Sequence, residues 1–189
     1  PPAPAWLALR AEVEKYGTRI VSPKAGEKRT WGGLRIDIVS PPEDYAPAKS
    51  PKNNDSLAFT MRFRERSILF TGDVERQMEA RMIADERIRR VDVLKVAHHG
   101  SKTSTSQDFL DSSQPVWALI SAGEGNLFHH PHAEIVKRLA RAKVQILNRP
   151  TRQARSGGPQ ETPRNREHTS FKLQSLRHDQ KTAPLIRDF

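Results

Sequence analysis

The 189 residues of the chain include no cysteine. This excludes disulfides, thiolate nucleophiles and cysteine-type zinc sites, so any metal has to be held by His, Asp or Glu. The sequence also lacks the run of roughly eighteen apolar residues that would cross a bilayer, and no signal segment opens it. Taken by itself, the chain is therefore expected to be soluble.

The length suits one domain with a core and leaves little room for a second one. The first residue is Pro1 rather than methionine, and a helical stripe of apolar residues already begins at Trp6. We therefore expect the chain to be a fragment that lacks residues upstream.

The formal net charge is +10, which would ordinarily suggest that the chain binds a polyanion. Half of this excess lies after Asn148, where nine Lys or Arg stand against four Asp or Glu. This stretch of Arg, Pro, Gly, Gln and Thr has no apolar period and cannot bury a core. We predict one domain over residues 1–148 and a basic, disordered tail over 149–189.

Apolar periodicity predicts an α/β fold with a parallel crossover unit, because strands and helices alternate after residue 67. Before that point the pattern indicates a helix, two further strands and a hairpin. The expected helices cover residues 6–16, 74–84, 107–110 and 133–142. The expected strands cover residues 18–21, 34–38, 56–63, 67–70, 91–97, 116–120 and 144–147.

Polar side chains follow three of the expected strands. Polar residues at the carboxyl ends of strands collect in one crevice of an α/β fold. The first such loop is Thr71-Gly72-Asp73, whose carboxylate at the strand tip could bridge two cations. Helix capping by Asp73 is an equally good interpretation.

The other two loops are rich in histidine. One is His98-His99-Gly100-Ser101, in which only one imidazole is expected to meet a metal, because adjacent side chains point to opposite sides. The other runs from Asn126 to His132 and could contact phosphate or metal. Two histidines bonded within a loop, and a surface loop before a helix, are the alternatives. Asn53-Asn54-Asp55-Ser56 could bind an anion or simply form a turn.

These motifs, taken in order, resemble the metallo-β-lactamase-like domain of ComEC competence proteins. The resemblance covers roughly residues 6–147. It rests on the motifs around Asn53 to Leu57, Leu69 to Asp73, Val93 to Ser101, Thr103-Ser104, and Asn126 to His132. It implies an αββα four-layer sandwich, of which the chain supplies mainly the C-terminal half.

The resemblance also implies a dinuclear centre with two divalent cations, zinc or manganese. Asp73 then corresponds to the aspartate that bridges the metals, and His99, with His98 as the alternative, to the late metal-binding histidine. Asn54, Ser56 and Ser101 would line the substrate side. His130, with Asn126, would be catalytic, and His130 could protonate the leaving group.

The implied reaction is hydrolysis of DNA phosphodiesters during DNA uptake. The implied partners are DNA and the remainder of a larger, membrane-embedded protein, with this domain at the outer face of the bacterial cytoplasmic membrane. One alternative is a free-standing hydrolase of the same superfamily that acts on another ester. Another is a non-catalytic remnant that binds nucleic acid through its tail.

The sequence departs from the family pattern in two places. The His-x-His-x-Asp-His cluster that supplies most ligands is absent, so the chain alone should not hold two metals and can be inactive by itself. The family's closing Thr-Asp-x-x-Gly-Ala-Val strand is also missing. Back-translation of residues 149–157 in another frame permits that pattern, and we hypothesise a frameshift near Asn148.

Overall fold

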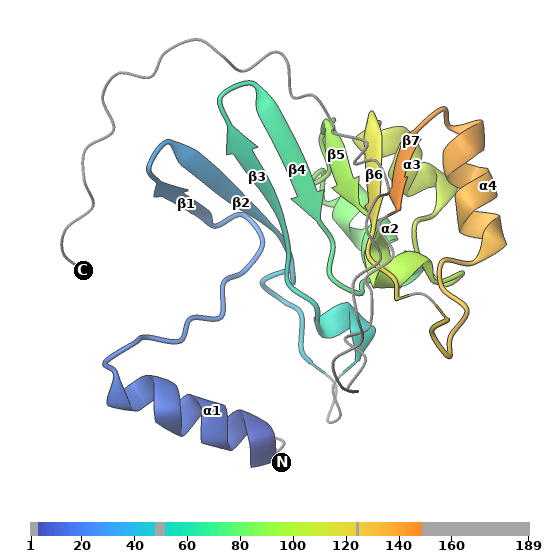
Figure 1. Ribbon diagram of the computed structural model, residues 1–189. Coiled ribbons are helices and arrows are strands. Elements are labelled where there is room, and N and C mark those ends of the chain that lie inside the picture. Colours follow the sequence, from blue (N-terminus) through green and yellow to red (C-terminus); the bar gives the residue numbers. More distant parts are fainter. Residues whose placement is uncertain (1–3, 48–51, 124, 149–189) are drawn as a thin grey trace, which may run out of the picture. The chain divides into compact units, whose positions relative to one another are not determined.

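The computed structural model describes residues 4–47, 52–123 and 125–148, which form one seven-stranded sheet in the order β1 to β7 (Figure 1). The elements are α1 (Pro4–Lys15), β1 (Lys28–Trp31), β2 (Leu34–Ser40), the 3-10 helix η1 (Asn53–Asp55), β3 (Ala58–Phe63), β4 (Arg66–Phe70), α2 (Arg76–Ala84), β5 (Val93–Lys95), the 3-10 turn η2 (Ala97–Gly100), α3 (Gln107–Ser113), β6 (Trp117–Ile120), α4 (Ala133–Arg141) and β7 (Gln145–Asn148).

The sheet changes character at β4. Strands β1 to β4 pair antiparallel, whereas β4 to β7 pair parallel. A parallel pair needs a crossover, and α2, α3 and α4 supply the three that are required. The carboxyl ends of β4, β5 and β6 consequently lie at the same edge of the sheet, which is where the polar loops begin.

One face of the sheet is packed against helices. Alternate strand residues such as Leu69, Leu94 and Ile120 join a single buried cluster with side chains of the helices. The helix contributions are Met78 and Met82 of α2, Phe109 and Leu110 of α3, and Ile135 and Leu139 of α4. Burying these side chains provides the main driving force for folding.

The opposite face of the sheet is also apolar. Phe59 and Phe70 stack on it with ring centroids 5.0 Å apart. Beside them lies a hollow of about 500 Å³ with a mostly apolar lining, composed of Leu34, Met61, Phe63, Arg66, Ser67, Ile68, Asp92, Val93 and Trp117. Phe63 remains 49% exposed. This face is therefore accessible to solvent in the described part of the chain, although its composition is that of a buried layer.

Most of the expected elements are confirmed, including the hairpin and the four helices. The strand expected over 18–21 is wrong, because these residues lie outside any helix or strand and leave Ile20 and Val21 exposed. A short run that contains apolar residues does not form a strand without a neighbouring strand that pairs with its backbone N–H and C=O groups.

Strand β1 was not expected. All of its four residues are exposed, so it has no hydrophobic alternation to detect, and pairing with β2 defines it. Strand β5 is shorter than the predicted 91–97, since the chain has turned by Val96. Residues 149–189, with the predicted tail and frameshift, lie outside the described residues. In the described part, no helix is both long and apolar enough to cross a membrane.

Candidate functional site

Three loops meet at the carboxyl edge of the parallel strands, one after each of β4, β5 and β6. The amide of His98 donates to the carbonyl of Gly72 at 3.1 Å, and the amide of His132 donates to that of Gly100 at 3.0 Å. The second loop is thus tied by backbone bonds to both of its neighbours. This arrangement brings the predicted residues of all three motifs into one region.

Asp73 is held by a close approach between two loops. Gly72 has φ +57°, and a Cβ atom there would lie 2.7 Å from Ser56 Cβ, so only glycine fits. The amide of Asp73 then donates to Ser56 Oγ at 3.0 Å. Ser56, predicted on the substrate side, therefore uses its hydroxyl oxygen to accept the hydrogen bond that fixes the backbone of Asp73.

His98 and His99 both adopt the left-handed conformation, with φ 47° and 56°. Such values cost a non-glycine residue free energy and persist where the surroundings impose them. The Nδ1 atom of His99 donates to the carbonyl of Ser121 at 2.5 Å. Because a carbonyl can only accept, Nε2 of the neutral ring keeps its lone pair, as in metal-binding histidines.

That Nε2 atom lies 3.8 Å from Oδ1 of Asp73. Two atoms that each stand about 2.1 Å from one cation are at most about 4.2 Å apart, so both could bind the same ion. Both side chains are nearly half exposed and open to solvent. The described residues contain no group of three or more His, Asp or Glu able to hold a metal. Asp73 and His99 can therefore supply part of the ligands of a metal ion, but they do not form a complete ligand set.

His98 faces a different set of groups. Its Nδ1 atom lies 3.9 Å from Glu75 Oε1 and 3.5 Å from Asn53 Nδ2. Glu75 also accepts bonds from Asn53 Nδ2 at 3.1 Å and from Thr103 Oγ1 at 3.0 Å. The geometry thus pairs Asp73 with His99, and it places His98 in a separate polar network around Glu75.

Sequence reasoning missed Glu75, whose only signal was its position two residues after Asp73, before α2. The amide of Glu75 donates to Asn54 Oδ1 at 2.8 Å. Asn54, predicted on the substrate side, thereby satisfies an amide at the start of α2 that has no partner within the helix. Its role toward a substrate stays a prediction.

His130 lies next to His98, with ring centroids 5.6 Å apart, and next to His132 at 5.1 Å. Asn126 shapes the loop, because its amide accepts from His130 N at 3.0 Å and donates to His130 O at 2.7 Å. Burial lowers the pKa of His130, repulsion from His132, His98 and His99 lowers it further, and Asp73 opposes them. This favours the neutral ring, so a proton-donating role for His130 stays a prediction.

Ser101 and Lys95 complete the region. Ser101 is buried, with its Oγ 3.1 Å from Thr103 Oγ1. Lys95, at the end of β5, directs its Nζ to the carbonyl of Gly72 at 3.4 Å. Burial lowers the pKa of Lys95, and the charge of Asp73 opposes the shift. Lys95 was not predicted, since a lysine among apolar strand residues gives no signal by itself.

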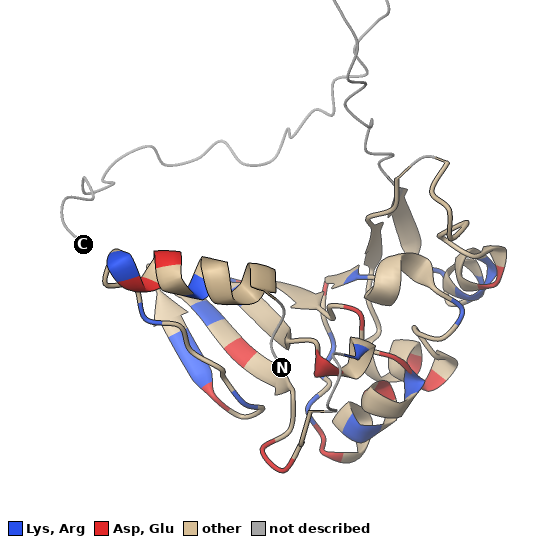
Figure 2. Cartoon of the chain, turned by 90° about the horizontal axis from the view of Figure 1, so that it is seen from below, with Lys and Arg blue, Asp and Glu red and all other residues tan. Residues whose placement is uncertain are grey.

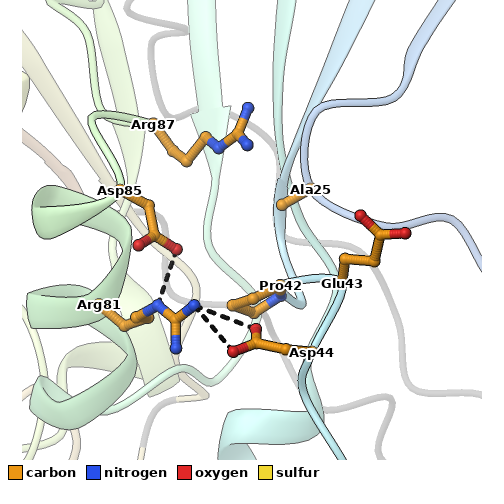
Figure 3. Close-up of a pocket in the computed structure, with 7 residues that line it drawn as sticks. All are labelled: Ala25, Pro42, Glu43, Asp44, Arg81, Asp85 and Arg87. Atoms are coloured by element: carbon orange, nitrogen blue, oxygen red, sulfur yellow. Dashed lines mark hydrogen bonds and ion pairs between the residues drawn. The ribbon is translucent and has the colours of Figure 1, made fainter.

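A larger hollow of about 580 Å³ lies elsewhere, between α2 and the loops around Ala25 and Pro42 (Figure 3). Its Arg81 is bound by Asp44 at 3.0 Å and by Asp85 at 2.8 Å. None of the predicted site residues lines it. Arg81, Asp44 and Asp85 are thus occupied with one another.

Comparison with known proteins supports the expected resemblance. No family model matches the chain. The chain is 37% identical over 139 residues to ComE operon protein 3 of Bacillus subtilis, covering 74% of the chain and 17% of that protein. It is also 37% identical over 124 residues to Recombination protein 2 of Haemophilus influenzae, covering 66% of the chain and 15% of that protein. The chain thus spans about a sixth of the length of these bacterial relatives.

Solved structures resemble the chain at low sequence identity. CmlA, a diiron β-hydroxylase from Streptomyces venezuelae, has a TM-score of 0.50 and 12% sequence identity. The match covers 78% of the present chain and 35% of the CmlA chain. A Thermotoga maritima protein described as a zinc-dependent hydrolase of the metallo-β-lactamase superfamily has a TM-score of 0.44 and 12% sequence identity. The match covers 69% of the present chain and 71% of the Thermotoga chain. The chain shares its fold with CmlA, and the resemblance to bacterial competence proteins is confirmed.

Proposed function

We propose that this metallo-β-lactamase-fold chain, similar to segments of bacterial competence proteins, is part of a metal-dependent hydrolase that cleaves DNA phosphodiesters during DNA uptake. The competence relatives supply the biological setting and the fold supplies the chemical class. By the same resemblance, the domain works at the outer face of the cytoplasmic membrane as part of a larger protein.

The approach of His99 to Asp73 is the observation that carries the proposal. Residues 26 positions apart in sequence present an imidazole lone pair and a carboxylate oxygen 3.8 Å from each other at a solvent-accessible edge. These are donors that zinc and manganese accept. Within the described residues, neither His99 Nε2 nor the Asp73 carboxylate has a hydrogen bond to another group.

Divalent cations bound here would activate water and stabilise charge on phosphate oxygens. The chain's own residues serve this chemistry in three ways. Asp73 and His99 provide ligands, while Ser56 Oγ fixes the backbone amide of Asp73 and the carbonyl of Ser121 fixes the ring of His99. Lys95 places a positive charge beside Asp73.

Substitution in the host bacterium tests the proposal, because it uses the protein in its complete context. Asp73→Asn and His99→Ala should each lower the frequency of transformation by added DNA by at least tenfold. Asp85→Asn, which alters a carboxylate bound to Arg81 away from the site, is the matched control and should leave that frequency unchanged. Normal transformation in the Asp73→Asn strain, with the protein present at normal level, would remove the proposed role.

A non-catalytic nucleic-acid-binding role is the second candidate. It is favoured by the lack of a group of three metal donors among the described residues. The same strains separate the two roles, because a binding protein without metal chemistry would tolerate Asp73→Asn. Hydrolysis of a different ester by the purified protein, without any on DNA, would instead favour the free-standing hydrolase.

A further inference from the structure

A charged groove lies away from the candidate site, at the β1 edge of the sheet. It has a volume of about 310 Å³ and is bounded by β1, β2, β3 and the segment after α2. Five cationic side chains and three carboxylates line it: Lys28, Arg35, Arg62, Arg87 and Arg89 against Glu27, Asp37 and Glu86. In Figure 2, blue and red bands mark the charged positions on the strands of this edge.

Two of the three carboxylates already have partners. Asp37 lies 3.8 Å from both Arg35 and Arg62 and is shared between them. Glu27 binds Arg29, which stands outside the groove, at 2.6 Å. Within the described residues, Lys28, Arg87 and Arg89 have no ion pair. The groove therefore keeps an excess of positive charge that its own carboxylates do not compensate.

The neighbouring hollow behaves differently, although Arg87 borders both. There Arg81 is bound by two carboxylates, whereas Figure 3 shows Arg87 pointing away from Asp85 with no bonded partner among the side chains drawn. The guanidinium of Arg87 instead lies against Gly26, where an added Cβ atom would be only 3.1 Å from Nη1. Gly26 thus leaves room for Arg87 to reach the groove.

We propose that this groove binds the phosphodiester backbone of one DNA strand on its way to the candidate site. This rests on the proposed function, whose substrate is DNA. Guanidinium groups match phosphate oxygens in geometry and charge, and a narrow basic groove suits a single backbone. A membrane surface fits less well, since it needs an exposed patch rather than a groove between strands and a loop.

The position of the groove agrees with this path. Helix α2 begins beside Glu75 and Thr103 of the candidate site and ends just before Glu86 and Arg87. Its nine residues span about 14 Å. A short stretch of single-stranded backbone would therefore be enough to connect the groove with the site.

Binding of a fluorescein-labelled 20-nucleotide single strand, followed by anisotropy at several salt concentrations in EDTA, tests the proposal. The double variant Arg87→Glu/Arg89→Glu should bind at least tenfold more weakly than the unaltered chain. Its slope of log affinity against log salt should be smaller by about 1.4, because each lost contact on a single strand removes about 0.7. Asp73→Asn should bind normally, since no metal is present.

The matched control is Lys137→Glu/Arg141→Glu on α4, which changes the charge equally at two exposed positions beside β7. The residues after 148 are the same in all variants, so their contribution cancels in the comparison. Equal weakening by both double variants, or none by the first, would overturn the proposal. So would tight binding to phosphatidylserine vesicles with the same dependence on Arg87 and Arg89 and no effect on DNA.

The two proposals fail separately. If the groove variant bound DNA normally while transformation still depended on Asp73, the hydrolase proposal would stand and only the proposed DNA path would be rejected. A confirmed groove with no role for Asp73 would leave a DNA-binding protein without the proposed chemistry. Circular dichroism and thermal unfolding of each double variant check that the fold is kept.

Discussion

His99 and Asp73 face each other from the loops that follow two neighbouring parallel strands, with Nε2 and Oδ1 3.8 Å apart. His98 instead turns toward Glu75 and Asn53. Of these two histidines, only His99 should therefore contribute to metal binding. Adding manganese or zinc should raise the melting temperature of the unaltered chain, because a ligand that binds the native state stabilises it. His99→Ala should abolish this rise, and His98→Ala should keep most of it, as thermal unfolding with and without metal would show. The opposite order would assign the ligand to His98.

The sequence predicted that the three polar motifs lie together, because each occupies a loop that follows a parallel strand. Asp73, His99 and His130 follow β4, β5 and β6, so strand order alone placed them at one edge. It could not choose between His98 and His99, since that depends on two left-handed residues and on the Ser121 carbonyl. Neither feature has a sequence signature.

The elements that the sequence mispredicted share a physical cause. Strand β1 is exposed at all four positions and exists through its pairing with β2, whereas residues 18–21 include the apolar Ile20 and Val21 but have no strand partner. Strand formation at an edge is set by which backbone groups find a neighbour. Hydrophobic alternation indicates which residues are buried. It does not indicate whether an edge segment such as β1 or residues 18–21 pairs with a neighbouring strand.

Gly100 should be intolerant of any side chain. Its φ is +86°, and a Cβ atom would lie 2.6 Å from Pro131 Cβ, so Gly100→Ala has to push apart two site loops. We expect a loss of about 2–4 kcal/mol in the free energy of unfolding, measured with urea. Gly125→Ala is the control, since it shares a positive φ of +66° but meets nothing within 4 Å. Similar losses for both would show that backbone conformation alone, and not the contact with Pro131, matters.

Glu79 should make stability depend on pH. Its buried carboxylate accepts bonds from the amides of Thr105 and Ser106, which follow the second site loop. Desolvation nevertheless raises its pKa above the ordinary 4.5. The native state then binds more protons than the unfolded one, so the stability due to Glu79 falls as pH rises from 4.5 through the folded pKa.

Two variants of Glu79 check this. Glu79→Gln cannot ionise, so its free energy of unfolding should lack that decline, and the difference from the unaltered chain should change with pH. Glu79→Ala leaves two buried amides without acceptors and should cost about 2–4 kcal/mol at neutral pH. Urea unfolding between about pH 4 and 8 measures both. A pH-independent difference for Glu79→Gln would mean that folding does not raise the pKa of Glu79.

The apolar face of the sheet opposite the helices should bind hydrophobic probes. Met61 and Phe63 lie beside Trp117 in its hollow, and Phe63 is half exposed, so charged substitutions there remove accessible apolar surface without opening the core. Met61→Glu/Phe63→Glu should reduce the fluorescence of bound anilinonaphthalene sulfonate several-fold and change the melting temperature little. Leu94→Ala, which opens a cavity on the packed face, should instead lower stability by about 2–5 kcal/mol. If the glutamate variant unfolded as readily as Leu94→Ala, this second face would already be part of the core, and the chain would need no further layer to cover it.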